Sequence, residues 1–116
     1  NLKNYLSIES ISVILASDPN GIIRAAAVQA LEQMGLAHED VAAPPLIAAL
    51  DDELSAVNVA ACVALRTVRS KQAIGPLVEL LASAKGRLSE EVWPTLVAIT
   101  DNQFNDNPQL WSDWWN

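Results

Sequence analysis

Apolar side chains recur at helical spacing along most of the chain. Ile23, Ala27, Leu31 and Met34 are separated by four, four and three positions, which places them on one face of an α-helix. No stretch alternates between apolar and polar residues over the length of a strand, so the pattern is typical of an all-α protein. It predicts helices over residues 4–16, 20–35, 41–51, 54–69, 73–84, 89–100 and 108–115.

The same pattern repeats along the chain. The segment that starts at Asp52 matches the one that starts at Asp18, 34 residues earlier, and a weaker third copy follows at an offset of 31 residues. The later copies carry the apolar stripes Val57, Ala61, Leu65, Val68 and Leu88, Val92, Leu96, Ile99. A shorter apolar segment follows each of the first two stripes and opens with Pro45 or Pro76, which suits the first turn of a second helix. Each unit is therefore expected to be a pair of helices.

Stacked helix pairs bury faces that one pair alone leaves exposed. The repeat thus predicts a short α-α superhelix, or solenoid, of about three helical hairpins in a single domain. The small pairs Ala26-Ala27 and Ala60-Ala61 are expected to let neighbouring helices approach closely. We expect an N-terminal helix over residues 4–16, repeat units over 18–51, 52–82 and 83–100, and a C-terminal segment over 101–116, all within residues 1–116.

Local signals predict how individual helices begin and end. Ser89 is expected to be the N-cap of a helix, with Leu88 and Trp93 forming a hydrophobic staple around it. Arg66 and Arg69 come near the end of a helix, where a positive charge complements the helix dipole.

Three groups of residues carry a family resemblance: Asp18 with Ile23-Arg24-Ala25-Ala26-Ala27, then Pro45-Leu46-Ile47-Ala48-Ala49-Leu50-Asp51-Asp52, and then Val57-Asn58 with Ala60-Ala61. Over roughly residues 8–100 the chain resembles the HEAT repeat family, and within it the bacterial subset of phycobilisome-lyase HEAT-like repeats. The resemblance implies a ladder of Asp and Arg side chains along the solenoid. Arg24 retains the arginine of this ladder, whereas Asn58 replaces it in the second copy.

The resemblance also implies a function, because HEAT proteins are mostly non-catalytic scaffolds for protein partners. It predicts a protein-protein interaction scaffold or adaptor that is not an enzyme and has no cofactor. Two alternatives stay open. One is a bilin lyase-like accessory protein of phycobilisome maturation, which the name of the subset suggests. The other is the C-terminal structural end of a longer solenoid protein, which the degenerate third copy suggests.

The C-terminal tail has no counterpart upstream. It contains three tryptophans, Trp111, Trp114 and Trp115, which share one face if Pro108 starts a helix. A solenoid needs an atypical end to cover its last apolar layer, so the tail is interpreted as a Trp-rich capping helix. An aromatic anchor for a partner is the second interpretation, since Trp is enriched at binding hot spots. Stacking of a carbohydrate on paired tryptophans is a third.

Composition and charge narrow the class of protein. Of 116 residues, 51% are apolar, which excludes an intrinsically disordered chain. Seven basic and 14 acidic residues give a net charge of −7, which disfavours nucleic acid as a partner. The longest uncharged runs, residues 41–50 and 54–65, are too short for membrane insertion. A single cysteine fits a cytoplasmic protein and an exported mature form equally, so the compartment stays open.

Few residues are candidates for chemistry. A nucleophile–base pair would need His38, the only histidine, to lie beside Cys62, the only cysteine, or beside a serine. Cys62 aligns with Val28 inside a helix and is expected in the core, whereas His38 is expected in a solvated loop. The carboxylates of residues 51–53 are interpreted as caps and solubilising groups rather than a cation site. No catalytic, metal or cofactor site is therefore predicted.

A partner surface is predicted on the second helix of each unit, because these helices present exposed side chains along one ridge. The predicted contact residues are Ile47, Ala48, Glu79 and Lys85, with Trp114 and Trp111 of the tail as candidate anchors.

Overall fold

Seven α-helices and two short 3-10 helices make up the part of the chain that the structure describes. The computed structural model describes residues 2–104 and 106–116, with side chains from residue 7 onward, and contains no strand in these residues. The elements are α1 (Leu2–Ser17), α2 (Gly21–Gly35), α3 (Glu39–Ala48), η1 (Ala49–Asp51), α4 (Ser55–Val68), η2 (Lys71–Ala73), α5 (Ile74–Ser83), α6 (Gly86–Thr100) and α7 (Pro108–Trp115). The all-α fold is confirmed, and each predicted helix has a counterpart.

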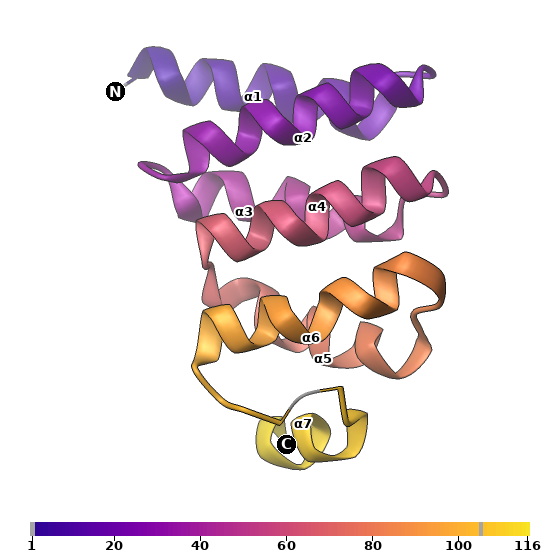
Figure 1. Ribbon diagram of the computed structural model, residues 1–116. Coiled ribbons are helices and arrows are strands. Elements are labelled where there is room, and N and C mark those ends of the chain that lie inside the picture. The colour runs from indigo at the N-terminus through magenta and orange to yellow at the C-terminus, as the bar shows by residue number, and fades with distance from the viewer. Residues whose placement is uncertain (1, 105) are drawn as a thin grey trace.

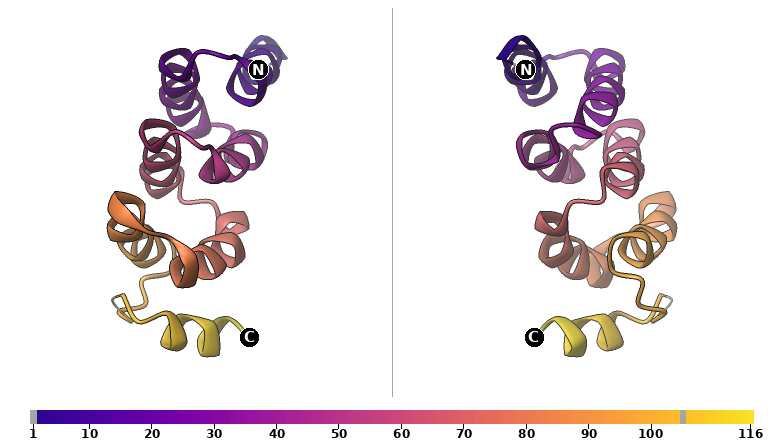
Figure 2. Two further views of the ribbon diagram at one scale, coloured as in Figure 1. Left: turned by 90° about the vertical axis from the view of Figure 1, so that its right-hand side faces the viewer. Right: turned by 90° about the vertical axis from the view of Figure 1, so that its left-hand side faces the viewer.

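The helices form two layers (Figure 2). In the first layer, α2 packs on α4 and α4 packs on α6. The helices α1, α3 and α5 form the second layer. The chain crosses between the layers as it descends from α1 to α7 (Figure 1), so that helical hairpins stack side by side. The final helix, α7, lies across the end of this stack and packs on α5. This arrangement is the short superhelix that the repeat predicts, with its Trp-rich C-terminal helix.

Several helices begin at a side-chain N-cap or end at a residue with left-handed backbone conformation. The Asn20 side chain accepts a backbone N–H at the start of α2, and Asn107 does the same ahead of Pro108, the first residue of α7. Arg69 and Asp101 have φ values of 60° and 63°, and they end α4 and α6 respectively. The stacked hairpins therefore have short, well-defined corners.

The prediction for the start of α6 was wrong. The helix begins at Gly86, three residues before Ser89, and Ser89 donates a hydrogen bond to the Gly86 carbonyl instead of capping the helix. Gly86 has a φ of +63°, a conformation that glycine adopts without strain, and it lets the chain enter the helix one turn early. Leu88 and Trp93 consequently lie inside the helix and do not form a hydrophobic staple around an N-cap.

The prediction that Pro45 lies in a first turn was also wrong. Backbone N–H groups of Ala37 and His38 both bond to the Met34 carbonyl, so the chain reverses quickly after α2 and α3 already begins at Glu39. Pro45 is therefore in the second turn of α3. The corresponding Pro76 does lie in the first turn of α5, where its missing N–H costs no helical hydrogen bond.

The apolar stripes form the core, although Met34 and Ile99 are half-buried and Ile23 is exposed. Val57, Leu65 and Leu96 are fully buried, and the stripe of α4 is buried along its whole length. In α2, however, Ile23 is 44% exposed although its counterpart Val57 is buried. Of the two alanine pairs, only Ala27 and Ala61 are buried, while Ala26 is exposed and Ala60 half-buried. The reason is positional, because α4 lies between two helices of its layer and α2 adjoins only one.

Candidate protein-interaction surface

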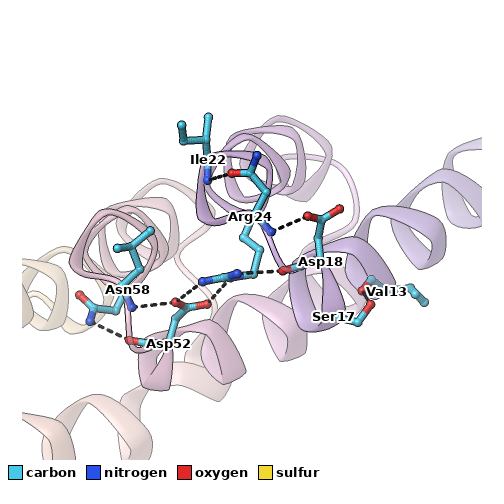
Figure 3. Close-up of polar contacts among 9 residues, drawn as sticks. Val13, Ser17, Asp18, Ile22, Arg24, Asp52 and Asn58 are labelled. Carbon is cyan, nitrogen blue, oxygen red and sulfur yellow. Dashed lines mark hydrogen bonds and ion pairs between the residues drawn. The ribbon is translucent and has the colours of Figure 1, made fainter.

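A row of polar residues crosses the corners of the first two units (Figure 3). Arg24 donates to both carboxylate oxygens of Asp52, at 2.9 Å from Nε and 3.1 Å from Nη2. The third Arg24 nitrogen, Nη1, donates to the Asp18 carbonyl at 2.8 Å. Asn58, which replaces the arginine in the next copy, donates from its side chain to the Asp52 carbonyl at 3.0 Å. The ladder is thus complete between the first and second units and ends at Asn58.

This ion pair shifts the pKa values of both side chains. The hydrogen bond from Arg24 is the largest cause that holds the pKa of the Asp52 carboxyl below its usual range, and burial opposes it. The same hydrogen bond raises the pKa of Arg24. Both side chains are largely buried, at 13% and 12% relative exposure. A bidentate pair of this kind fixes the angle between neighbouring units as well as contributing stability.

Replacing Asp52 with asparagine is expected to lower the thermal unfolding midpoint at neutral pH and to have progressively less effect below about pH 4. The pKa of Asp52 is lowered by folding, so its stabilising contribution is complete above the unfolded-state pKa and is lost as the pH falls through the folded-state pKa. Circular dichroism melts of both proteins over this pH range measure the difference.

The matched control for this experiment is Asp51→Asn, which removes the same charge from an exposed neighbouring residue. It should change the midpoint little at any pH. A loss in the Asp52→Asn protein that is the same at acid and neutral pH would contradict a stabilising role for the ionised carboxylate.

A second polar cluster joins α4 to α6. Arg66 donates to the Glu91 carboxylate at 2.9 Å and to the Thr95 hydroxyl at 3.2 Å. Arg69 donates two hydrogen bonds to the Ala98 carbonyl, in α6. The prediction that these two arginines serve the dipole of their own helix missed this role. They bind groups of the next first-layer helix, which no pattern within one helix indicates.

Cys62 and His38 lie in different settings. The Cys62 thiol is buried, 3.4 Å from the Glu91 carbonyl and from the Thr95 hydroxyl of α6, and burial is the main cause that raises the pKa of this thiol. A raised pKa disfavours the thiolate that a nucleophilic cysteine needs. His38 lies half-buried between α2 and α3. Cys62 is thus a core residue, as predicted.

Two adjoining hollows lie on the second-layer helices. One, of about 230 Å³, lies between α3 and α5 and is lined by Ile47, Leu50, Asp51, Pro76, Glu79, Leu80 and Ser83. The other, of about 270 Å³, lies between α1 and α3 and includes Leu15, Pro45, Ala48 and Asp51 in its lining. Asp51 lines both hollows, so the two adjoin at this residue, and we call the pair of hollows the second-layer groove.

The second-layer groove brings together three of the predicted contact residues. Ile47 and Glu79 line the first hollow and Ala48 lines the second. Lys85 is exposed at the start of α6 and lines neither hollow. Asp51 was interpreted from the sequence as a capping group and was not predicted as a groove residue. It ends η1, the short turn that continues α3, and no local pattern distinguishes that position from a cap.

The tryptophans of α7 differ in their burial and in their contacts. Trp111 is fully buried and meets the ring of Phe104 edge-on, with ring centroids 4.9 Å apart. Trp114 packs edge-on against Trp111 at 6.1 Å and is 43% exposed. Trp115 lies against Gly75 of α5. A Cβ added to Gly75 would be 3.2 Å from the Trp115 ring. Trp111 therefore belongs to the packing of α7, and Trp114 is the tail tryptophan available at the surface among the predicted anchors.

Stacked helical hairpins in two layers, joined by ion pairs between successive units, define an α-solenoid protein. A family model for HEAT repeats matches residues 8–102, and the chain belongs to the HEAT repeat family. The match is to HEAT repeats in general and does not single out the phycobilisome-lyase subset. No curated protein and no solved structure matches the chain significantly. HEAT repeats generally mediate protein-protein interaction and are typically non-catalytic.

Neither a membrane-spanning helix nor a metal site is found among the described residues. None of the described helices combines the length and apolar character needed to cross a membrane. Within the described residues, no group of three or more His, Cys, Asp or Glu side chains is arranged to hold a metal ion. None of the carboxylates at residues 51–53 is the N-cap of α4, which is Leu54, but Asp52 accepts the Leu54 N–H at 2.9 Å in the turn before the helix and also binds Arg24.

Proposed function

We propose that this protein is a non-catalytic HEAT-repeat scaffold that binds a protein partner along the second-layer groove. The observation that carries the proposal is a pair of hollows over α1, α3 and α5 that have Asp51 in common in their lining. Membership of the HEAT family supports a protein as the partner. The burial of Cys62 supports a role that does not depend on its thiol.

The lining of the groove suggests the chemistry of the partner. Ile47 and Leu80 offer apolar surface, while Asp51 and Glu79 place two carboxylates beside it. Neither carboxylate has a basic partner among the described residues. A segment that presents apolar side chains flanked by lysine or arginine therefore complements the groove.

A photo-reactive amino acid at position 48 tests this proposal in cells that naturally contain the protein. Ala48 is exposed and lines the groove, whereas Ala56 is an exposed alanine of the first-layer helix α4 that lines a separate hollow with Val59 and Val63. We expect one cross-linked protein from position 48 and none from position 56. Glu79→Lys should abolish that cross-link, because it replaces an attractive charge with a repulsive one.

Other outcomes would contradict the proposal. Cross-linking from position 114 alone would make the α7 tryptophan the anchor, and equal cross-linking from positions 48 and 56 would show that binding is not confined to the second-layer groove. A cellular activity that requires His38 or Cys62, while surviving Glu79→Lys, would indicate an enzyme and not a scaffold.

A further inference from the structure

The first layer of helices has a hollow of its own. It has a volume of about 470 Å³, lies between α4 and the start of α6, and is lined by Ser55, Ala56, Val59, Ala60, Val63 and Arg87. Both helices begin at the same edge of the first layer, at the right of Figure 1. None of these residues lines either hollow of the second-layer groove. We call this separate surface the first-layer hollow.

One wall of the first-layer hollow is an apolar face of α4. Positions 56, 59, 60 and 63 share that face by helical spacing, and all four are alanine or valine. Ala56 is exposed, and Ala60 and Val63 are half-buried. Because α4 and α6 already pack on each other, this surface lies along the side of the stack and not at one of its ends. It is therefore not a face that stacking of a further repeat would cover.

The charge of the corners between helices changes sign at this hollow. The corner before α2 carries Asp18, and the corner before α4 carries the three acidic residues 51–53. The start of α6 carries Lys85 and Arg87 instead, and no acidic residue occurs from residue 80 to residue 89. In a chain with a net charge of −7, this corner is a local site of positive charge, and we expect it to attract an anion.

Arg87 differs from the other described arginines because its guanidinium is unengaged. Arg24 and Arg66 form ion pairs, and Arg69 donates to a carbonyl of α6. Arg87 is exposed and forms no ion pair within the part of the chain that the structure describes. Glu91, one turn further along α6, is bound by Arg66. A free guanidinium at the rim of an apolar wall complements a carboxylate that is joined to an apolar chain.

We propose that the first-layer hollow binds a small amphipathic carboxylate, an aliphatic chain with one terminal carboxylate, as in a medium-chain fatty acid. Arg87 donates two hydrogen bonds to the carboxylate, and the chain lies along the alanine and valine side chains of α4. The volume of the hollow falls in the range of small-molecule sites. A phosphate without an apolar part would use Arg87 alone and leave the apolar wall in water. This site is independent of the second-layer groove and of a protein bound there.

Titration of the ¹⁵N-labelled full chain with decanoate, below the concentration at which it forms micelles, tests the site by NMR. We expect saturable shift changes that centre on the backbone amides of Ser55, Ala56 and Arg87, and none at Ala48 or Glu79 of the second-layer groove. Hexanoate has four fewer methylene groups and should bind about tenfold more weakly, because an open hollow provides only part of the energy of full methylene burial.

A pair of variants tests the contact with the carboxylate. Arg87→Gln should weaken decanoate binding about threefold, as expected for an exposed ion pair, and should leave the affinity for uncharged decan-1-ol unchanged. Lys85→Gln is the matched control, because it removes the same charge from an exposed residue of this corner that does not line the hollow. It should change the affinity for decanoate less than Arg87→Gln does.

A second pair of variants tests the apolar wall. Ala56→Glu places a carboxylate in the hollow and should weaken decanoate binding about tenfold or more, because it repels the ligand and fills its space. Ala26→Glu adds the same charge to an exposed alanine of α2 and should bind decanoate normally. Both alanines are exposed, so circular dichroism should show that both variants are folded.

Three results would overturn the proposal. The first is a set of shift changes that does not saturate or that centres on the second-layer groove. The second is an affinity for decanoate that Arg87→Gln leaves unchanged or reduces no more than the affinity for decan-1-ol, because Arg87 would then not bind the carboxylate. The third is a protein cross-linked from position 56 that decanoate does not displace, because the first-layer hollow would then hold a protein.

Discussion

Replacing Ala61 with aspartate is expected to leave the chain largely unfolded at 25 °C, whereas Ala56→Asp should fold with near-normal stability. Both alanines lie in α4, but Ala61 is fully buried and Ala56 is exposed. An ionised carboxylate at position 61 would lack a basic partner in the core and would cost several kcal/mol, a large part of a typical domain's total stability. Urea denaturation followed by circular dichroism measures both variants.

The packing of α4 against its neighbour α2 is also close. Neighbouring first-layer helices approach closely, as shown by Gly35 of α2, where an added Cβ would lie 2.7 Å from Val68 of α4. A core packed this closely relaxes little around a larger polar group. Ala61→Asn separates size from charge, because it is nearly isosteric with aspartate. A midpoint for Ala61→Asp close to that of Ala56→Asp would show that the α4 stripe is not the core of the stack.

The helices and their stacking were predictable because one repeated stripe determines both. The spacing of Val57, Ala61, Leu65 and Val68 defines a helical face, and its recurrence at 34 residues requires that the faces cover one another. The resemblance implied a ladder of Asp and Arg side chains that includes Arg24, and Arg24 forms it with Asp52. These features depend on local spacing and on repetition, and both are visible in a single sequence.

The contacts between elements were less predictable. The start of α6 depends on the backbone conformation of Gly86, whereas the sequence offers a more obvious N-cap at Ser89. The bonds from Arg66 and Arg69 to α6 depend on how two helices are rotated relative to each other. The stripe of α2 predicted a buried Ile23, but burial at that position requires a neighbouring helix that the pattern of α2 itself does not reveal.

The groove and the tail were also only partly predictable, because both depend on contacts between elements. Ile47 and Glu79 were selected because they lie on second helices, yet the hollow that joins them arises from the spacing between α3 and α5. Helical periodicity placed Trp111, Trp114 and Trp115 on one face, but only Trp111 is fully buried. Whether a tryptophan packs or stays exposed depends on the elements that it meets, here Phe104 and the start of α5.

Trp111→Ala is expected to destabilise the protein by about 3–5 kcal/mol, the usual cost of truncating a fully buried aromatic side chain. The indole of Trp111 is enclosed at 0% exposure, and its edge-on contacts with Phe104 and Trp114 add to the energy of burial. Removal of this ring leaves a large cavity between α7 and the rest of the stack. Urea denaturation monitored by circular dichroism measures the loss.

Trp114→Ala is the matched control, because Trp114 comes from the same helix but is 43% exposed. It should cost about 1 kcal/mol or less if α7 stabilises the end of the stack mainly through Trp111. Acrylamide quenching gives an independent check, since loosening of α7 in the Trp111→Ala protein should make Trp114 and Trp115 more accessible to the quencher. Equal destabilisation by the two variants would mean that the aromatic cluster acts as a unit. A negligible effect of Trp111→Ala would mean that α7 contributes little to the fold, and that its tryptophans serve a partner instead.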